Sequence, residues 1–155
     1  MAFDSFTQQD TTKIDSKCRI VIPSMFRAAL GEEFRISLGL QNCLYIMDNK
    51  SFKKISRSIA SRPMSESAKI ARRFNAFSFC AKPDKQGRVV LPPPLRNALG
   101  IDVGETLVLA GLGPYIEVWR ERDWIGAYNL KEEDTSEYMS YMQFDIDDDD
   151  EPDEL

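Results

Sequence analysis

Residues 14–31 read IDSKCRIVIPSMFRAALG, and residues 83–100 repeat the pattern as PDKQGRVVLPPPLRNALG. Eight positions are identical in register, and most of the others keep their apolar or polar character. Such an internal repeat predicts one supersecondary unit that is present twice. Because both copies keep the charged turn, the repeat favours a protein that binds a repetitive partner over an enzyme with one reaction centre.

Each copy predicts the same order of strands and helices. Pro23 and Pro92 follow short apolar runs and suit the first turn of a helix, which Gly31 and Gly100 then end. The expected elements of the first copy are a strand before the turn, strands 20–22, 34–38 and 43–47, the helix ending at Gly31 and a closing helix from Asp48. Those of the second are a strand before the turn, strands 89–91, 107–110 and 116–119, the helix ending at Gly100 and a closing helix from Glu121. The order ββαββα, found twice, predicts an α+β fold.

Domain boundaries follow from this order. Pro63 opens a further helix whose apolar residues are Ile70, Phe74 and Phe77. The expected segments are a first repeat with its closing helix at 1–62, a linker helix at 63–79, a second repeat at 80–131 and an acidic tail at 132–155.

Charge is distributed unevenly along the chain. Residues 132–155 hold 12 of the 25 acids and no base, so residues 1–131 carry 20 bases against 13 acids, a net charge of +7. Residues 49–79 hold eight bases and one acid. This basic stretch forms either a second surface that contacts phosphates or a helix face that is only solvated. The tail is predicted to be disordered, and it acts as a DNA mimic that competes for the basic body, docks on a partner or solubilises the protein.

Composition excludes several kinds of site. The chain has no histidine, which removes the commonest general base and metal ligand and excludes triad hydrolases, so we predict no enzyme. Cys18, Cys43 and Cys80 lie far apart, which indicates neither disulfides nor a zinc site; we expect them to be reduced, with Cys43 and Cys80 only packing. No cofactor or membrane association is predicted. With neither a secretory signal nor a long apolar run, the expected location is the cytoplasm.

The repeated turn carries residues suited to DNA. Asp15 and Asp84 can accept backbone N–H groups, while Arg19 and Arg88 present planar donors that match guanine O6 and N7. Lysines suit phosphates. The candidate DNA-binding residues are Lys13, Asp15, Lys17, Arg19, Lys82, Asp84, Lys85 and Arg88, with Arg27 and Arg96 as weaker candidates for phosphate contacts. In the alternative interpretation, each Asp and Arg form an internal ion pair that only braces the hairpin.

The motif Asp-x-x-x-Arg, a short β run, Pro and a helix ending in Leu-Gly, doubled in one chain, resembles the MraZ family of the AbrB/SpoVT-like superfamily. The resemblance covers roughly residues 3–130 and includes the stretches 39–44, 111–113 and 116–119. It implies two AbrB-like repeats forming a swapped-hairpin β barrel with flanking helices. It also implies cyclic homo-oligomers, nucleoid association and binding to double-stranded promoter DNA upstream of the division and cell-wall gene cluster.

One position departs from the family pattern. The first turn of the family normally reads Asp-x-Lys-Gly-Arg, whereas Cys18 stands here at the glycine position that Gly87 keeps in the second copy. If that position needs a positive φ, cysteine strains it by about 1 kcal/mol or more.

Two functions therefore compete. The first is a sequence-specific transcription regulator, expected to repress at short direct repeats. The second is an AbrB-like, antitoxin-type protein-interaction module whose acidic tail binds a basic partner. A steep loss of DNA affinity with rising salt would favour the transcription regulator, and the absence of such a loss would favour the interaction module.

Overall fold

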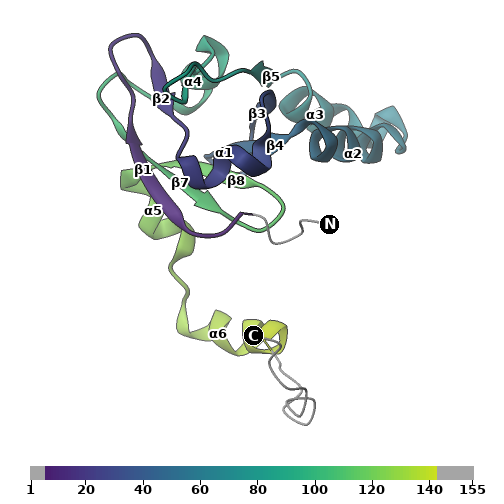
Figure 1. Cartoon of the computed structure of the whole chain (residues 1–155). Coiled ribbons are helices and arrows are strands. Elements are labelled where there is room, and N and C mark those ends of the chain that lie inside the picture. The colour runs from purple at the N-terminus through teal and green to yellow at the C-terminus, as the bar shows by residue number, and fades with distance from the viewer. Residues whose placement is uncertain (1–5, 143–155) are drawn as a thin grey trace, which may run out of the picture. The chain divides into compact units, whose positions relative to one another are not determined.

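The computed structural model describes residues 6–142 and contains the predicted ββαββα order twice (Figure 1). The first repeat comprises β1 (Gln9–Lys13), β2 (Arg19–Val21), α1 (Ser24–Leu30), β3 (Phe34–Leu38), β4 (Leu44–Asp48) and α2 (Asn49–Ala60). The second comprises β5 (Ser78–Ala81), β6 (Arg88–Val90), α4 (Pro93–Leu99), β7 (Thr106–Gly111), β8 (Ile116–Arg120) and α5 (Glu121–Tyr128). Helix α3 (Met64–Phe74) lies between the repeats, and α6 (Glu132–Met139) with a short 3₁₀ helix (Ser140–Met142) follows them. The mixed α and β composition is thus confirmed.

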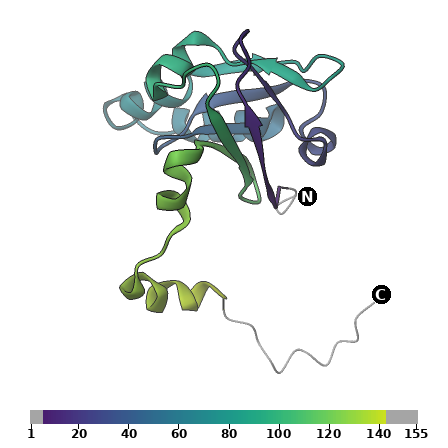
Figure 2. The same ribbon diagram turned by 90° about the vertical axis from the view of Figure 1, so that its left-hand side faces the viewer.

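The chain forms two compact units, one ending at Trp124 and the other beginning at Ile125. In the first unit, a six-stranded antiparallel sheet has the order β1-β7-β8-β4-β3-β5, and β2 pairs separately with β6. β1 runs beside β7 (Figures 1 and 2), with Gln9 opposite Ala110, while β5 pairs with β3. Three strand pairs therefore join one repeat to the other in addition to the β4–β8 contact, so neither repeat completes its strand pairing alone.

Both repeats contribute to one hydrophobic core. Phe26 and Leu95 from the short helices are fully buried there, together with Ile36 of β3 and Leu107 of β7. The strand residues follow the period of two that places alternate side chains on one face. Gly31 and Gly100 end α1 and α4 with positive φ, as the sequence predicts.

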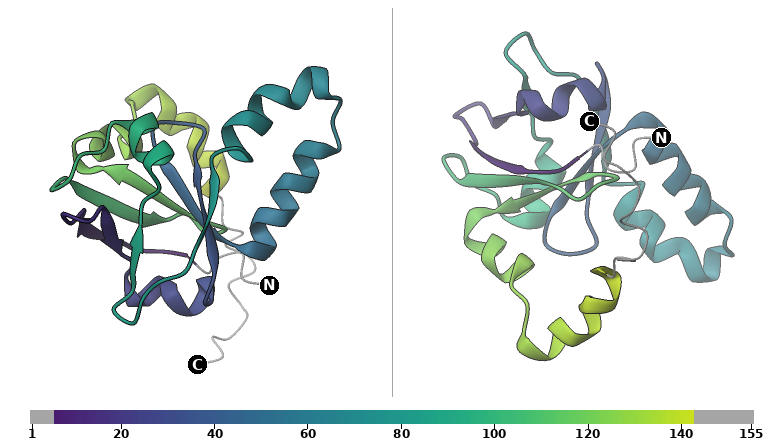
Figure 3. Two further views of the ribbon diagram at one scale, coloured as in Figure 1. Left: turned by 90° about the horizontal axis from the view of Figure 1, so that it is seen from above. Right: turned by 60° about the horizontal axis from the view of Figure 1, so that its bottom comes forward.

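Helices α2 and α3 form an antiparallel pair (Figure 3) on the opposite face of β3 from the core. Arg35 alternates with the buried Phe34 and Ile36, and its guanidinium lies 4.5 Å from the ring centroid of Phe52. Phe52 stacks in turn on Phe74 at 5.4 Å. One end of the helix pair is thereby fixed to the sheet.

Two packing expectations are wrong. Phe77 lies beyond α3, which ends at Phe74; it packs against the core from the turn because β5 must be extended from Ser78 to pair with β3. Cys80 is exposed rather than packed, because it alternates with the buried Ala81 on a strand at the edge of the sheet. Cys43 is buried as expected.

The expectation of disorder throughout residues 132–155 is also wrong at its start, where α6 occupies Glu132–Met139. Glu132, Glu133 and Asp134 fall in the first turn, where negative charge interacts favourably with the helix dipole. Residues 143–155 of the predicted tail lie outside the described residues. Among the helices within 6–142, none is long and apolar enough to cross a membrane.

Candidate nucleic-acid interface

The β2–β6 pair forms a short ribbon whose outer face belongs equally to both repeats. Arg19 lies opposite Val90, and Val21 lies opposite Arg88. Val21 and Val90 are 42% and 56% exposed, whereas Ile20 and its partner Val89 turn into the core. Two arginines and two valines therefore share one exposed face, and the arginines are diagonal neighbours at roughly 7–8 Å.

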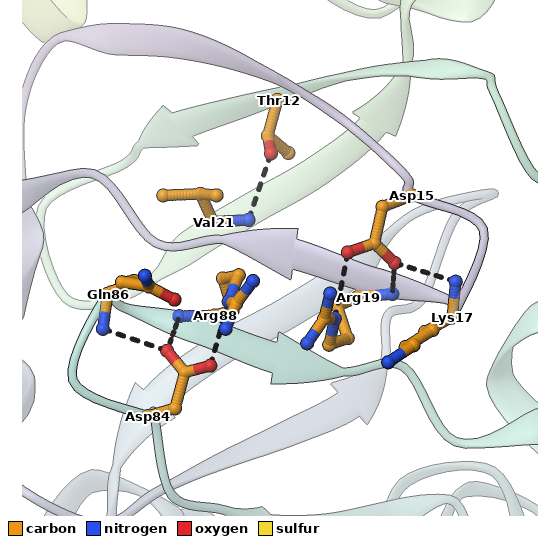
Figure 4. A network of polar contacts seen from close by, with 8 residues as sticks. All are labelled: Thr12, Asp15, Lys17, Arg19, Val21, Asp84, Gln86 and Arg88. Carbon is orange, nitrogen blue, oxygen red and sulfur yellow. Dashed lines mark hydrogen bonds and ion pairs between the residues drawn. The ribbon is translucent and has the colours of Figure 1, made fainter.

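The first turn is organised by the Asp15 carboxylate. Its Oδ1 accepts hydrogen bonds from the backbone N–H groups of Lys17 (2.9 Å) and Arg19 (2.8 Å), and Oδ2 accepts one from Arg19 Nε at 2.8 Å (Figure 4). The backbone hydrogen bond from Arg19 is the largest cause that lowers the pKa of Asp15, and the Arg19 side chain adds to it. The carboxylate stays charged and holds the arginine at the start of β2.

The second turn repeats this arrangement. Asp84 Oδ1 accepts from the backbone N–H groups of Gln86 and Arg88, each at 2.9 Å, and Oδ2 accepts from Arg88 Nε at 2.8 Å. The backbone hydrogen bond from Arg88 likewise lowers the pKa of Asp84. Because β2 and β6 are antiparallel and each turn precedes its own strand, the two turns lie at opposite ends of the ribbon (Figure 4).

The ion pairs that brace the hairpins leave most donors of the guanidinium groups available. In each pair the contact to the carboxylate is made by Nε. Within the described residues, the two terminal nitrogens of Arg19 and Arg88 donate no hydrogen bond, so each side chain keeps four N–H donors. The side chains are 24% and 33% exposed. Each of these two arginines can therefore brace its hairpin through Nε and bind a partner through its terminal nitrogens.

The glycine position of each turn adopts a positive φ, +61° at Cys18 and +78° at Gly87. The carbonyl oxygen of Cys18 accepts from Leu91 N at 2.8 Å, and that of Gly87 accepts from Ile22 N at 2.8 Å. Each turn thus ties down the strand end of the other repeat. A Cβ at Gly87 would lie 2.7 Å from Arg27 Cζ, so a side chain there would have to displace the Arg27 guanidinium, whereas the partly buried Cys18 is accommodated with backbone strain.

We expect Cys18→Val to lower the free energy of unfolding by about 1 kcal/mol or more, because a β-branched side chain tolerates positive φ even less than cysteine. The matched control is Cys80→Val on the exposed face of β5, which should stay within about 0.5 kcal/mol of the wild type. Urea unfolding of the three proteins measures the difference. Equal stability of the two variants would contradict the strain assigned to the first turn.

The remaining predicted residues surround the ribbon. Arg27 Nε donates to the Ile22 carbonyl at 2.9 Å and Arg96 Nε to the Leu91 carbonyl at 3.2 Å, so both arginines brace the ends of the ribbon strands. Their contact with phosphate stays a prediction. The four lysines, all exposed, are Lys13, Lys17, Lys82 and Lys85. Of these, Lys82 and Lys85 line a hollow of about 370 Å³ beside Asp84.

Sequence reasoning missed three residues of this site. Thr12 is buried, and its Oγ1 accepts from Val21 N at 3.0 Å, which joins β2 to β1 (Figure 4). Val21 and Val90 belong to continuous apolar runs, in which alternation gives no sign of the exposed side. The identity of the two valines at the same repeat position was the signal that could have drawn attention to them.

The site and fold define a duplicated chain whose two like halves share one ribbon and one core. A family model described as "MraZ protein, putative antitoxin-like" matches residues 5–77 and again 78–143. The chain therefore belongs to the MraZ family.

Curated relatives agree with this assignment. A protein of Lachnoclostridium phytofermentans is 35% identical over 112 residues, covering 72% of this chain and 78% of its own. A protein of Halothermothrix orenii is 34% identical over 134 residues, covering 84% of this chain and 91% of its own length. Both are named "Transcriptional regulator MraZ". The solution structure of PHS018 from Pyrococcus horikoshii covers 76% of this chain and 97% of its own at 19% identity, but its TM-score of 0.34 is too low to argue a shared fold.

Proposed function

We propose that this chain is a sequence-specific DNA-binding transcription regulator that places the β2–β6 ribbon in the major groove. The observation that carries the proposal is the pair of carboxylate-braced arginines on one exposed ribbon face. The names of the curated relatives support regulation of transcription.

The chemistry of the ribbon fits base recognition. The major groove of B-DNA, about 12 Å wide, admits a two-stranded β-ribbon. The terminal nitrogens of Arg19 and Arg88 supply the two donors that guanine O6 and N7 accept, and the methyl groups of Val21 and Val90 suit the thymine methyl group. The lysines at the turns contact phosphates and fix the register without reading sequence.

The same proposal extends to assembly and target. The exchange of strand pairing between repeats supports a swapped-hairpin barrel, and a homo-oligomeric ring of such chains would present many equivalent ribbons. Short direct repeats engage several ribbons together, so avidity multiplies individually weak contacts. We propose that the operator lies upstream of the division and cell-wall gene cluster, as the resemblance to the family implies, and that binding represses transcription.

Fluorescence anisotropy with the full chain tests DNA binding. The probes are a duplex from upstream of this chain's own reading frame and a scrambled duplex of equal length, each titrated between low and physiological salt. We expect preference for the first duplex and a log–log salt slope of about −0.9 per neutralised phosphate. Weak binding to both duplexes without a salt slope would overturn the proposal and favour the antitoxin-type interaction module.

A further inference from the structure

The helix pair α2–α3 leaves an apolar groove uncovered. No residue of α2 is fully buried, although Phe52, Ile55 and Ile59 form an apolar stripe along it. A hollow of about 260 Å³ lies between this helix, α3 and the sheet, lined by Leu40, Tyr45, Ile55, Ile59, Ile70 and Tyr115 among others. A second hollow of about 170 Å³ shares Ile55 and Tyr115, so the groove continues along α2 toward Lys54.

The two helices that form this groove are strongly basic, and Lys54 lines its second hollow. Residues 49–79 carry eight bases and one acid, and Lys53, Lys54, Arg57, Lys69 and Arg72 are exposed on the two helices. An apolar groove between two basic helices fits a segment that combines large apolar side chains with acids. Glu66 is the single acid in this stretch, so a basic segment would meet unfavourable charge.

The chain itself contains a segment of that composition. Residues 132–142 present four exposed large side chains, Tyr138, Met139, Tyr141 and Met142. Tyr141 is 76% exposed, and the rings of Tyr138 and Tyr141 pack edge to face at 5.6 Å. The same segment carries Glu132, Glu133, Asp134 and Glu137 and no base. Methionine and tyrosine adapt well to apolar docking surfaces.

We propose that residues 132–142 of one copy dock in the α2–α3 groove of a second copy. Tyrosine and methionine side chains fill the groove, while the acids are attracted to Lys54 and to the other bases of the two helices. Because groove and segment are different surfaces of the same chain, the contact is head-to-tail, which closes into a ring when the rotation permits. It supplies the subunit contact that the proposed ring requires, and it uses none of the residues of the β2–β6 ribbon.

Photo-crosslinking locates the segment. Full-length protein with p-benzoylphenylalanine in place of Tyr141 is prepared in ¹⁴N and ¹⁵N forms, which are mixed in denaturant, refolded together, irradiated and digested. We expect adducts that join the two isotopes and map to peptides within residues 49–74. Adducts confined to one isotope would place the segment on its own chain, and adducts elsewhere or their absence would remove the groove as its site; each result overturns the proposal.

A charge placed in the groove tests the contact independently. Ile59→Glu should shift the mass measured by light scattering toward the monomer, whereas Ser58→Glu, the same charge on an exposed position of α2, should leave the mass unchanged. Circular dichroism checks that both variants fold. Equal masses for both variants and the wild type would overturn the groove contact. Binding to a duplex with one operator repeat should persist in Ile59→Glu, so loss of assembly and failure of DNA recognition are distinguishable.

Discussion

Arg19→Ala combined with Arg88→Ala is expected to abolish specific operator binding without unfolding the protein. Each lost bidentate contact costs about 1–3 kcal/mol, or roughly 5- to 150-fold in affinity. The loss compounds when several subunits engage adjacent repeats. The fold should persist because ion pairs near the surface contribute only about 0–1 kcal/mol each. Anisotropy with operator and scrambled duplexes, together with thermal melts, measures both properties.

Two matched variants separate recognition from charge. Arg122→Ala removes one positive charge from an exposed position on α5 and should leave operator preference intact. Arg19→Lys with Arg88→Lys keeps the charge but loses the planar fork, so it should retain binding to scrambled DNA and lose the preference for the operator. Wild-type operator affinity in the double alanine variant would refute the ribbon as the reading surface.

Gly111→Ala is expected to destabilise the first unit strongly. A Cβ at this position would lie 2.4 Å from the Phe6 carbonyl carbon and 2.5 Å from Thr7 N, both backbone atoms that cannot rotate away. Gly111 N also donates to Gln8 O at 2.9 Å, so relief of the clash would disturb the start of the β1–β7 pairing. Overpacking of this kind costs about 1–3 kcal/mol, which for a chain of this length corresponds to a melting temperature lower by roughly 2–12 °C.

Gly126→Ala is the matched control in α5. Among the described residues beyond its own stretch of helix, no atom lies within 4 Å of the position of its Cβ, and alanine favours helix over glycine by up to about 1 kcal/mol. Its melting temperature should therefore equal or exceed that of the wild type. Scanning calorimetry compares the two variants. A melting temperature of Gly111→Ala as high as that of Gly126→Ala would contradict the prediction, because it would show that the backbone of Phe6 and Thr7 moves aside without loss of stability.

Local patterns predicted the elements well because their causes are local. Pro23 and Pro92 start the short helices, Gly31 and Gly100 end them, and the i, i+4 spacing of Asp15 and Arg19 lets the turn close on itself. The departure at Cys18 was also visible in sequence, since the family pattern has glycine there, and its positive φ confirms the reason. The length of α3 was harder to predict, because the pairing of β5 with β3 ended the helix before Phe77.

The sequence by itself determined the duplicated ββαββα unit, the Asp–Arg turns and the concentration of basic residues between the repeats. Only the tertiary structure decided that β2 pairs with β6, which sets Arg19 opposite Val90 and turns both valines outward. The reason is physical, because the pairing of strands almost 70 residues apart depends on how the apolar faces of both repeats pack into one core. Local propensity depends only on neighbouring residues, so it does not specify which distant strand becomes the partner.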